Sequence, residues 1–177
     1  MHRGRCVLVV CHCLLNTNAK VAPLATAPGA LLGVLEPFLR DGVGLMQLPC
    51  PETAYLGCNR WGMTREQYDH PAYRRACAGM VQPVVDQLQA LVRDGCTVLA
   101  VLGVDGSPSC GVFQTCEGYG GGEIADPQIR AQAAHAARLV PGRGVFLDVL
   151  HAMLAEAGII PPYWAVDEHA PTAIRTE

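Results

Sequence analysis

The chain has 177 residues, of which 50% are hydrophobic and 16% are charged, and its formal net charge is -3. This length fits one domain over residues 1–177, large enough to bury a core. The weak negative charge offers no basic field for a phosphate backbone, which argues against binding of a nucleic-acid duplex. No stretch approaches the roughly 18 uninterrupted apolar residues of a membrane span, so we expect no membrane partner.

The first part of the chain predicts a strand, a helix and a second strand. Residues 6–10 form a short, β-branched apolar run, which is typical of a central strand covered on both faces. Residues 31–39 have a helical pattern that Asp41-Gly42 would end. Residues 43–48 predict the second strand.

The strongest helical pattern lies at residues 71–94, where apolar residues follow one stripe and Gly95 provides the stop. Pro83 interrupts this pattern, because an interior proline loses a backbone hydrogen bond. We expect one kinked helix here rather than two. Residues 96–104 then predict a third buried strand.

The last part of the chain predicts a helix at residues 146–157 and a strand at 159–166. Pro161-Pro162 restricts the beginning of that strand to an edge or a bend. Strands that alternate with helices are typical of α/β proteins. The sequence therefore predicts a single-domain, Rossmann-like α/β fold, with a mainly parallel sheet and helices on both faces.

Nine cysteines are many for a chain of this length, and their number is odd. The apolar run near the N-terminus is too short for a secretory signal, so we expect a cytoplasmic protein. Disulfides are rare in that compartment, and thiols there act as metal ligands or as small buried hydrophobes. For Cys6, Cys77 and Cys96, which fall in apolar segments, we expect simple packing.

Three further cysteines lie where predicted strands run out into loops. Cys13 follows the first strand, Cys50 the second and Cys110 the third. The carboxyl ends of parallel strands share one edge of a sheet, so thiols far apart in sequence can meet there. Their separations do not suit the local cysteine pairs of zinc ribbons. The pattern predicts a soft metal centre that the fold assembles.

Other cysteines leave the set of ligands open. Cys11 stands two residues before Cys13, and in an extended segment both side chains would point the same way. Cys11 is therefore an alternative first ligand. Cys58 and Cys116 lie in predicted loops near these motifs. Either could be a fourth ligand or a spare thiol.

The three surroundings together resemble a known family. Cys13-Leu14-Leu15 after the first strand, Cys50-Pro51-Glu52 after the second and Ser107-Pro108-Ser109-Cys110-Gly111 after the third match, in order and rough spacing, motifs of the thiouracil desulfidase family and its uncharacterised relatives. The resemblance spans about residues 6–111. The chain departs from the family pattern at Asn16 and along residues 55–62.

The resemblance implies a [4Fe-4S] cluster held by Cys13, Cys50 and Cys110, with one iron left for the sulfur of a thiolated small molecule such as a thio-base. It also places Glu52 where the family has an acidic residue near the cluster, and Ser107 on a motif serine. Such a site would convert C=S to C=O by hydrolysis, without redox change. Glu52 would activate water and Ser107 would donate a hydrogen bond or position the base.

Simpler interpretations stand beside these roles. A carboxylate after a strand often caps the next helix, which is an alternative for Glu52. Serines beside a proline often bond their own backbone, which we expect of Ser109 and which stays open for Ser107. For the whole protein, the alternative is a structural or sulfur-handling protein whose cysteines bind zinc or carry persulfide. The sequence does not reveal whether the chain associates with itself.

Overall fold

A computed structural model describes residues 3–22, 24–121, 125–167, 170 and 173–176, with the side chains of 133–135 excepted. In this described part, a five-stranded sheet has the order β2-β1-β3-β6-β7. Its strands are β1 (Cys6–Val10), β2 (Gly44–Gln47), β3 (Thr97–Val104), β6 (Tyr163–Val166) and β7 (Ile174–Thr176). β1 pairs in parallel with β2 and β3, β3 pairs in parallel with β6, and β7 is antiparallel to β6. The predicted, mainly parallel sheet is confirmed.

The order of the strands creates a switch point between β1 and β3. From β1 the chain moves outward to β2 and then returns to the other side of β1 to form β3. Loops that leave the carboxyl ends of β1 and β3 therefore diverge to opposite faces. In open α/β sheets the crevice between such loops is where ligands bind.

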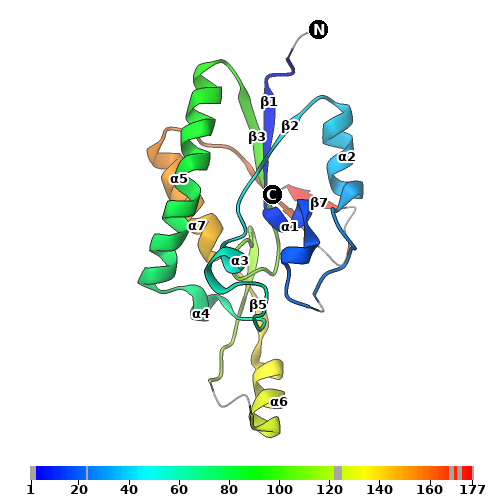
Figure 1. Cartoon of the computed structure of the whole chain (residues 1–177), viewed down its shortest axis with the longest axis vertical. Coiled ribbons are helices and arrows are strands. Elements are labelled where there is room, and N and C mark those ends of the chain that lie inside the picture. Colours follow the sequence, from blue (N-terminus) through cyan, green and yellow to red (C-terminus); the bar gives the residue numbers. More distant parts are fainter. Residues whose placement is uncertain (1–2, 23, 122–124, 168–169, 171–172, 177) are drawn as a thin grey trace.

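Helices cover both faces of the sheet, as predicted. The long helix α5 (Pro71–Arg93) packs against α7 (Val145–Glu156) on one face, and α2 (Leu32–Arg40) lies on the other (Figure 1). Phe38 of α2 stacks on Trp164 of β6 with ring centroids 6.1 Å apart. Right-handed crossovers explain why the helices lie on different faces. The connection to β2 runs in one direction along the sheet, and those to β3 and β6 run in the other. The chain has a Rossmann-like α/β fold.

One predicted helix is confirmed, and one predicted strand begins later than expected. The residues at 71–93 form a single helix with Pro83 inside it, as the sequence predicts. The last parallel strand begins at Tyr163 rather than at residue 159, since Pro161 and Pro162 have no amide hydrogen for a ladder. The carbonyl of Pro162 still accepts a hydrogen bond from the Val101 amide at 2.9 Å, which aligns β6 with β3.

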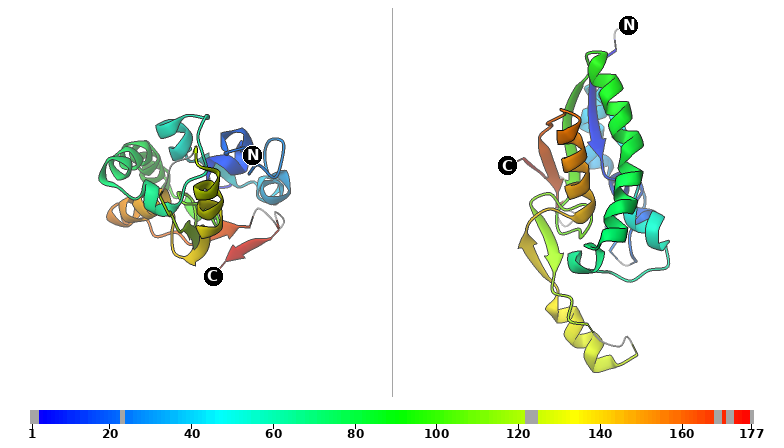
Figure 2. Two further views of the ribbon diagram at one scale, coloured as in Figure 1. Left: turned by 90° about the horizontal axis from the view of Figure 1, so that it is seen from below. Right: turned by 90° about the vertical axis from the view of Figure 1, so that its left-hand side faces the viewer.

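The sequence did not predict several short elements. They are α1 (His12–Leu15), the 3₁₀ turn η1 (Thr17–Ala19), α3 (Pro51–Leu56) and α4 (Arg65–Tyr68). An arm is also added, in which β4 (Gln114–Glu117) pairs antiparallel with β5 (Arg138–Pro141) and carries α6 (Pro127–Ala136). Figure 2 shows α6 extending away from the rest of the molecule. The base of this arm becomes one wall of the site described below.

The core lies between the sheet and its helices. Val7 to Val10 are all buried, which explains why β1 is a continuous apolar run rather than an alternating one. Tyr68, Tyr73 and Phe146 are the largest buried side chains among those less than 2% exposed. No helix in the described ranges has the length and apolar character needed to span a bilayer.

Leu102 in β3 tests the packing of this core. We expect Leu102→Ala to lower the free energy of unfolding by about 2–5 kcal/mol, because the side chain is fully buried in the middle strand and its loss leaves a cavity. Leu32→Ala is the control, since Leu32 is 64% exposed and its loss should change stability by about 0.5 kcal/mol or less. Urea unfolding measures both, and equal effects would contradict this description of the core.

Candidate functional site

A cavity of about 660 Å³ opens at the carboxyl ends of β1, β2 and β3. Its lining includes all five residues of the predicted site, Cys13, Cys50, Glu52, Ser107 and Cys110. Its volume is within the range of about 300–1,000 Å³ that is usual for small-molecule sites. The fold thus brings three segments that are distant in sequence to one cavity, next to the switch point of the sheet.

The segment after β1 places Cys11 and Cys13 differently, and the expectation that both point the same way is wrong. β1 ends at Val10, and residues 12–15 form the helical turn α1, so strand alternation does not relate the two cysteines. Cys11 is fully buried at the N-cap of α1. Cys13 is half-buried and lines the cavity.

Cys50 begins the helix after β2. It is the N-cap of α3, and its sulfur accepts a hydrogen bond from the Thr53 amide at 3.4 Å. Pro51 occupies the first turn, where a missing amide hydrogen costs nothing. The cap of this helix is therefore Cys50 rather than Glu52, and the Glu52 carboxylate is directed to another partner.

Glu52 forms a shielded ion pair with Arg60, at 3.3 Å between Oε2 and Nε. The Arg60 side chain is 5% exposed and that of Glu52 is 16% exposed. Arg60 also donates to the carbonyl of Gly57 at 2.9 Å and to that of Ala19 at 2.6 Å. It thereby joins the segment after β1 to the helix after β2. No sequence pattern marked Arg60 as part of the site.

The loop after β3 folds back onto the strand that precedes it. The amide of Val104 donates to the carbonyl of Cys110 at 2.8 Å. Asp105 supports the return, because its Oδ1 accepts from the amides of Val112, Phe113 and Gln114 at 3.1, 2.9 and 3.2 Å. A carboxylate before a glycine thus organises the turn.

The two serines of this loop have different contacts, and the backbone bond expected of Ser109 is made by Ser107 instead. Ser107 Oγ accepts from the amides of Ser109 and Cys110 at 3.3 and 2.9 Å, so Ser107 is the serine that bonds its own backbone. Ser109 is fully buried, and its Oγ lies 2.9 Å from the Tyr73 hydroxyl. Ser107 fixes the turn that presents Cys110, and Ser109 fastens the same turn to α5.

Two glycines allow the backbone of this loop to approach its neighbours. A Cβ on Gly103 would lie 2.6 Å from the carbonyl oxygen of Cys110 and 2.7 Å from Cδ1 of Leu147. A Cβ on Gly144, at the N-cap of α7, would lie 2.4 Å from the carbonyl carbon of Ser109. The third thiol is therefore held by backbone contacts that exclude any side chain at these positions.

The buried thiols are disposed to stay protonated. A hydrogen bond with Cys11 is the main cause that raises the pKa of Cys110, followed by burial and by the neighbouring Cys11, Glu52 and Cys50. Burial, with a contribution from Glu52, also raises the pKa of Cys116. Negative charges that lie close together repel one another, so these neighbours disfavour the thiolate forms of Cys110 and Cys116.

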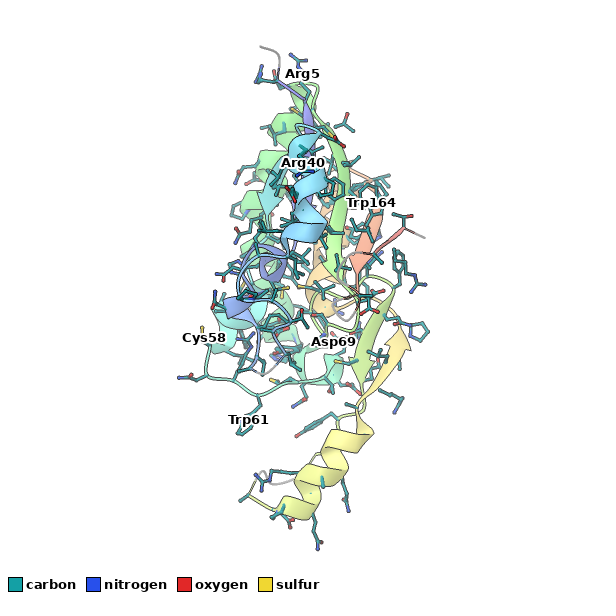
Figure 3. The ribbon with its side chains drawn as sticks, turned by 90° about the vertical axis from the view of Figure 1, so that its right-hand side faces the viewer. Arg5, Arg40, Cys58, Trp61, Asp69 and Trp164 are labelled. Atoms are coloured by element: carbon teal, nitrogen blue, oxygen red, sulfur yellow. The ribbon has the colours of Figure 1, made fainter. Side chains whose placement is uncertain are left out.

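The remaining candidate cysteines separate clearly. Cys116 lines the cavity from β4, and its sulfur lies 3.8 Å from the Met63 carbonyl oxygen. Cys58 is exposed on the loop between α3 and α4. Figure 3 shows Cys58 and Trp61, which lie on the same loop, both directed outward. In the described part of the chain, no group of three or more His, Cys, Asp or Glu side chains is arranged to hold a metal ion.

Comparison with known proteins gives one informative relative. The chain is 37% identical to the uncharacterized protein MJ0003 of Methanocaldococcus jannaschii over 112 residues, which are 63% of this chain and 71% of the relative. The chain belongs to the MJ0003 family. No protein-family model matches it, and no solved structure does. Since MJ0003 is itself uncharacterized, membership in the MJ0003 family assigns no activity.

A substitution at Gly103 tests how this member of the MJ0003 family positions Cys110. We expect Gly103→Ala to lower the free energy of unfolding by about 1–3 kcal/mol, because the added methyl group overlaps the Cys110 carbonyl. The displaced loop should also expose the Cys110 thiol to alkylation, which mass spectrometry can follow.

Gly79→Ala is the matched control. Gly79 lies inside α5 with open space around its Cα, so alanine there should raise stability by about 0.5–1 kcal/mol. Alkylation of Cys110 should not change in this variant. If Gly103→Ala behaves like Gly79→Ala, the close approach of the loop to β3 does not hold Cys110 in place.

Proposed function

We propose that this protein is an iron-sulfur-dependent desulfidase that hydrolyses a C=S bond of a thiolated small molecule, such as a thio-base, to C=O. The observation that carries the proposal is the shared cavity: thiols from three strand ends line it together with a carboxylate and an arginine. The sequence motifs that resemble the thiouracil desulfidase family are the same residues. The reaction combines the thiocarbonyl compound with water and releases hydrogen sulfide.

The residues of the cavity fit a [4Fe-4S] cluster in their chemistry. Thiolates are the usual protein ligands of such clusters, and Cys13, Cys50 and Cys110 would hold it. A cluster attaches each thiolate to a different iron, so its ligands need not crowd around one ion as those of a zinc site do. When bound, the cluster would supply a soft Lewis acid for the substrate sulfur.

Glu52 is suited to be the base in this reaction. Its carboxylate lines the cavity, and Arg60 neutralises its charge from the side. Glu52 would take a proton from the water that attacks the thiocarbonyl carbon, and the proton would then reach the departing sulfide. The ion pair with Arg60 fixes the direction of the carboxylate.

Ser107 has a defined structural part in this proposal. Its Oγ accepts the Cys110 amide at 2.9 Å and the side chain also lines the cavity. It would therefore orient one cluster ligand, and its own hydroxyl hydrogen remains to be donated toward a negative charge that develops on the substrate. This gives Ser107 a positioning role, with direct hydrogen bonding to substrate as its second one.

Metal analysis tests the ligand set. Anaerobically purified protein should contain about four irons and four acid-labile sulfides per chain. Replacement of Cys13, Cys50 or Cys110 by alanine should abolish retention of the iron, because each removes a thiolate. Cys96→Ala is the control, since Cys96 precedes the opposite end of β3 and should leave the iron content unchanged.

The same measurement separates the alternative. A colourless protein with about one zinc per chain would contradict the desulfidase and support a structural zinc site. Iron lost equally from Cys58→Ala or Cys116→Ala would show that the ligand set is wrong.

Sulfide release tests the role of Glu52. With thio-bases and thioamides as trial substrates, Glu52→Gln should retain the iron and lose about 100- to 10,000-fold in turnover, because the amide cannot accept the proton. Glu36→Gln, on the exposed face of α2, should keep full turnover. Arg60→Met should lower stability by about 3–5 kcal/mol, since it leaves Glu52 shielded from water without its partner. Turnover that survives in Glu52→Gln would remove Glu52 from the mechanism.

A further inference from the structure

Tyr73 lies between the loop that carries Cys110 and the helix that begins after Cys50. It is fully buried in the first turn of α5. Its hydroxyl oxygen lies 2.9 Å from Oγ of Ser109, the residue before Cys110. Its ring meets the ring of Tyr55, in α3, edge to face with the centroids 5.2 Å apart. One side chain thus contacts two segments that carry proposed ligands.

The backbone hydrogen bonds of these two segments lead to different parts of the molecule. The Cys110 loop is held to α7, because two amides at the start of that helix donate to the Ser109 carbonyl at 3.0 and 3.1 Å. In α3, the Thr53 hydroxyl donates to the Ala19 carbonyl at 3.1 Å, which fastens α3 to the segment after β1. Tyr73 connects the first set of contacts to the second.

The contact between Tyr73 and Ser109 determines position more than stability. Both residues are fully buried. A buried hydrogen bond adds little net stability, since two apolar groups of similar shape can replace both partners at almost no cost. If the loop shifted, however, each hydroxyl would lose its partner, and an unpaired buried hydroxyl is costly. The contact therefore favours one placement of Ser109, and of Cys110 beside it, relative to α5.

We propose that Tyr73 is a positioning residue of the metal centre, which sets the place of Cys110 relative to Cys50. The inference rests on the proposed function. The Tyr73 hydroxyl holds the Cys110 loop, and its ring holds α3 through Tyr55. Because a cluster has fixed dimensions, its ligands must be held at a matching separation. Groups that orient metal ligands in this way typically contribute about 10- to 100-fold to metal affinity.

The first test removes the hydroxyl alone. Tyr73→Phe, in the full chain purified anaerobically, should lose iron to a chelator at about 10-fold lower chelator concentration than the unsubstituted chain, because the Cys110 loop is no longer fixed to α5. The electron paramagnetic resonance spectrum of its reduced cluster should change, since one ligand is displaced. In the iron-free chain, the Cys110 thiol should react faster with an alkylating reagent, which mass spectrometry measures.

A double variant separates position from stability. Tyr73→Phe alone leaves the Ser109 hydroxyl buried without a partner and should lower the midpoint of urea unfolding. Tyr73→Phe combined with Ser109→Ala removes both hydroxyls, so the midpoint should return close to that of the unsubstituted chain. Iron retention should stay as low as in Tyr73→Phe. Iron retention that recovers together with the midpoint would overturn the positioning role, because stability alone would then explain the loss.

Tyr163→Phe is the matched control. The Tyr163 side chain lies in β6, and its buried hydroxyl has no hydrogen-bond partner within the described ranges. Its removal should change neither iron retention nor the alkylation of Cys110.

Tyr55→Leu tests the second contact of Tyr73. The loss of one aromatic pair should lower iron retention by about 2- to 10-fold. Full retention of iron in this variant would overturn the link between Tyr73 and the helix after Cys50.

The remaining contrary results concern Tyr73 itself. Iron retention in Tyr73→Phe equal to that of the unsubstituted chain would overturn the role of Tyr73 and leave the desulfidase proposal standing. Equal losses in Tyr73→Phe and Tyr163→Phe would also overturn it, since any buried hydroxyl would then have the same effect. Unsubstituted protein without iron would remove the proposed function, and the role of Tyr73 with it.

Discussion

The return of the Ser107–Gly111 loop onto β3 is the constraint on which the rest of the site depends. The loop lies against Gly103 on one side and against Gly144 on the other, and neither position has room for a Cβ. Its place is consequently fixed by close backbone contacts with β3 and with the N-terminus of α7, which involve no thiol group. The position of Cys110 then decides where the proposed centre, shared with Cys13 and Cys50, would form.

A second connection holds the other two segments. Arg60 donates to the Ala19 carbonyl at 2.6 Å, and Thr53 Oγ1 donates to the same carbonyl at 3.1 Å. The turn after β1 is thereby fastened to the helix after β2 through one backbone oxygen. Because these bonds do not involve the cavity-lining thiols, the rim can keep its shape whether or not a metal centre is present, which is the kind of preorganised support that functional sites require.

Much of the fold could be predicted because the spacing of apolar residues indicates its main helices and strands. Residues 7–10 and 100–104 within the runs at 6–10 and 96–104 are continuously buried, and strands of that type are easily recognised in a sequence. The arm with α6 could not be predicted, since its residues bury little and show no clear stripe. α1 and α3 were missed for another reason: helices of four to six residues are specified by caps and local packing, and a period cannot be read from so few positions.

The predicted site residues reach one cavity because the carboxyl ends of parallel strands share an edge, and that rule requires only the order of elements. The partners of those residues were beyond prediction. Arg60 joins Glu52 through a loop without regular structure, and Ser109 bonds Tyr73 of α5 across 36 residues of sequence. Such contacts depend on where loops pack in three dimensions, and no local pattern in a single sequence records them.

The pairing of Glu52 with Arg60 also makes chemical sense beside three thiols. A free carboxylate next to an iron centre would compete with cysteine for the metal and would repel the thiolates that hold it. A guanidinium at 3.3 Å, itself only 5% exposed, occupies one face of the carboxylate and offsets its charge. In the reaction we propose, Glu52 would then remain near the substrate as a base without becoming a ligand. In the proposed reaction, Arg60 is therefore what allows an acidic residue and a thiolate-held metal centre to share one cavity.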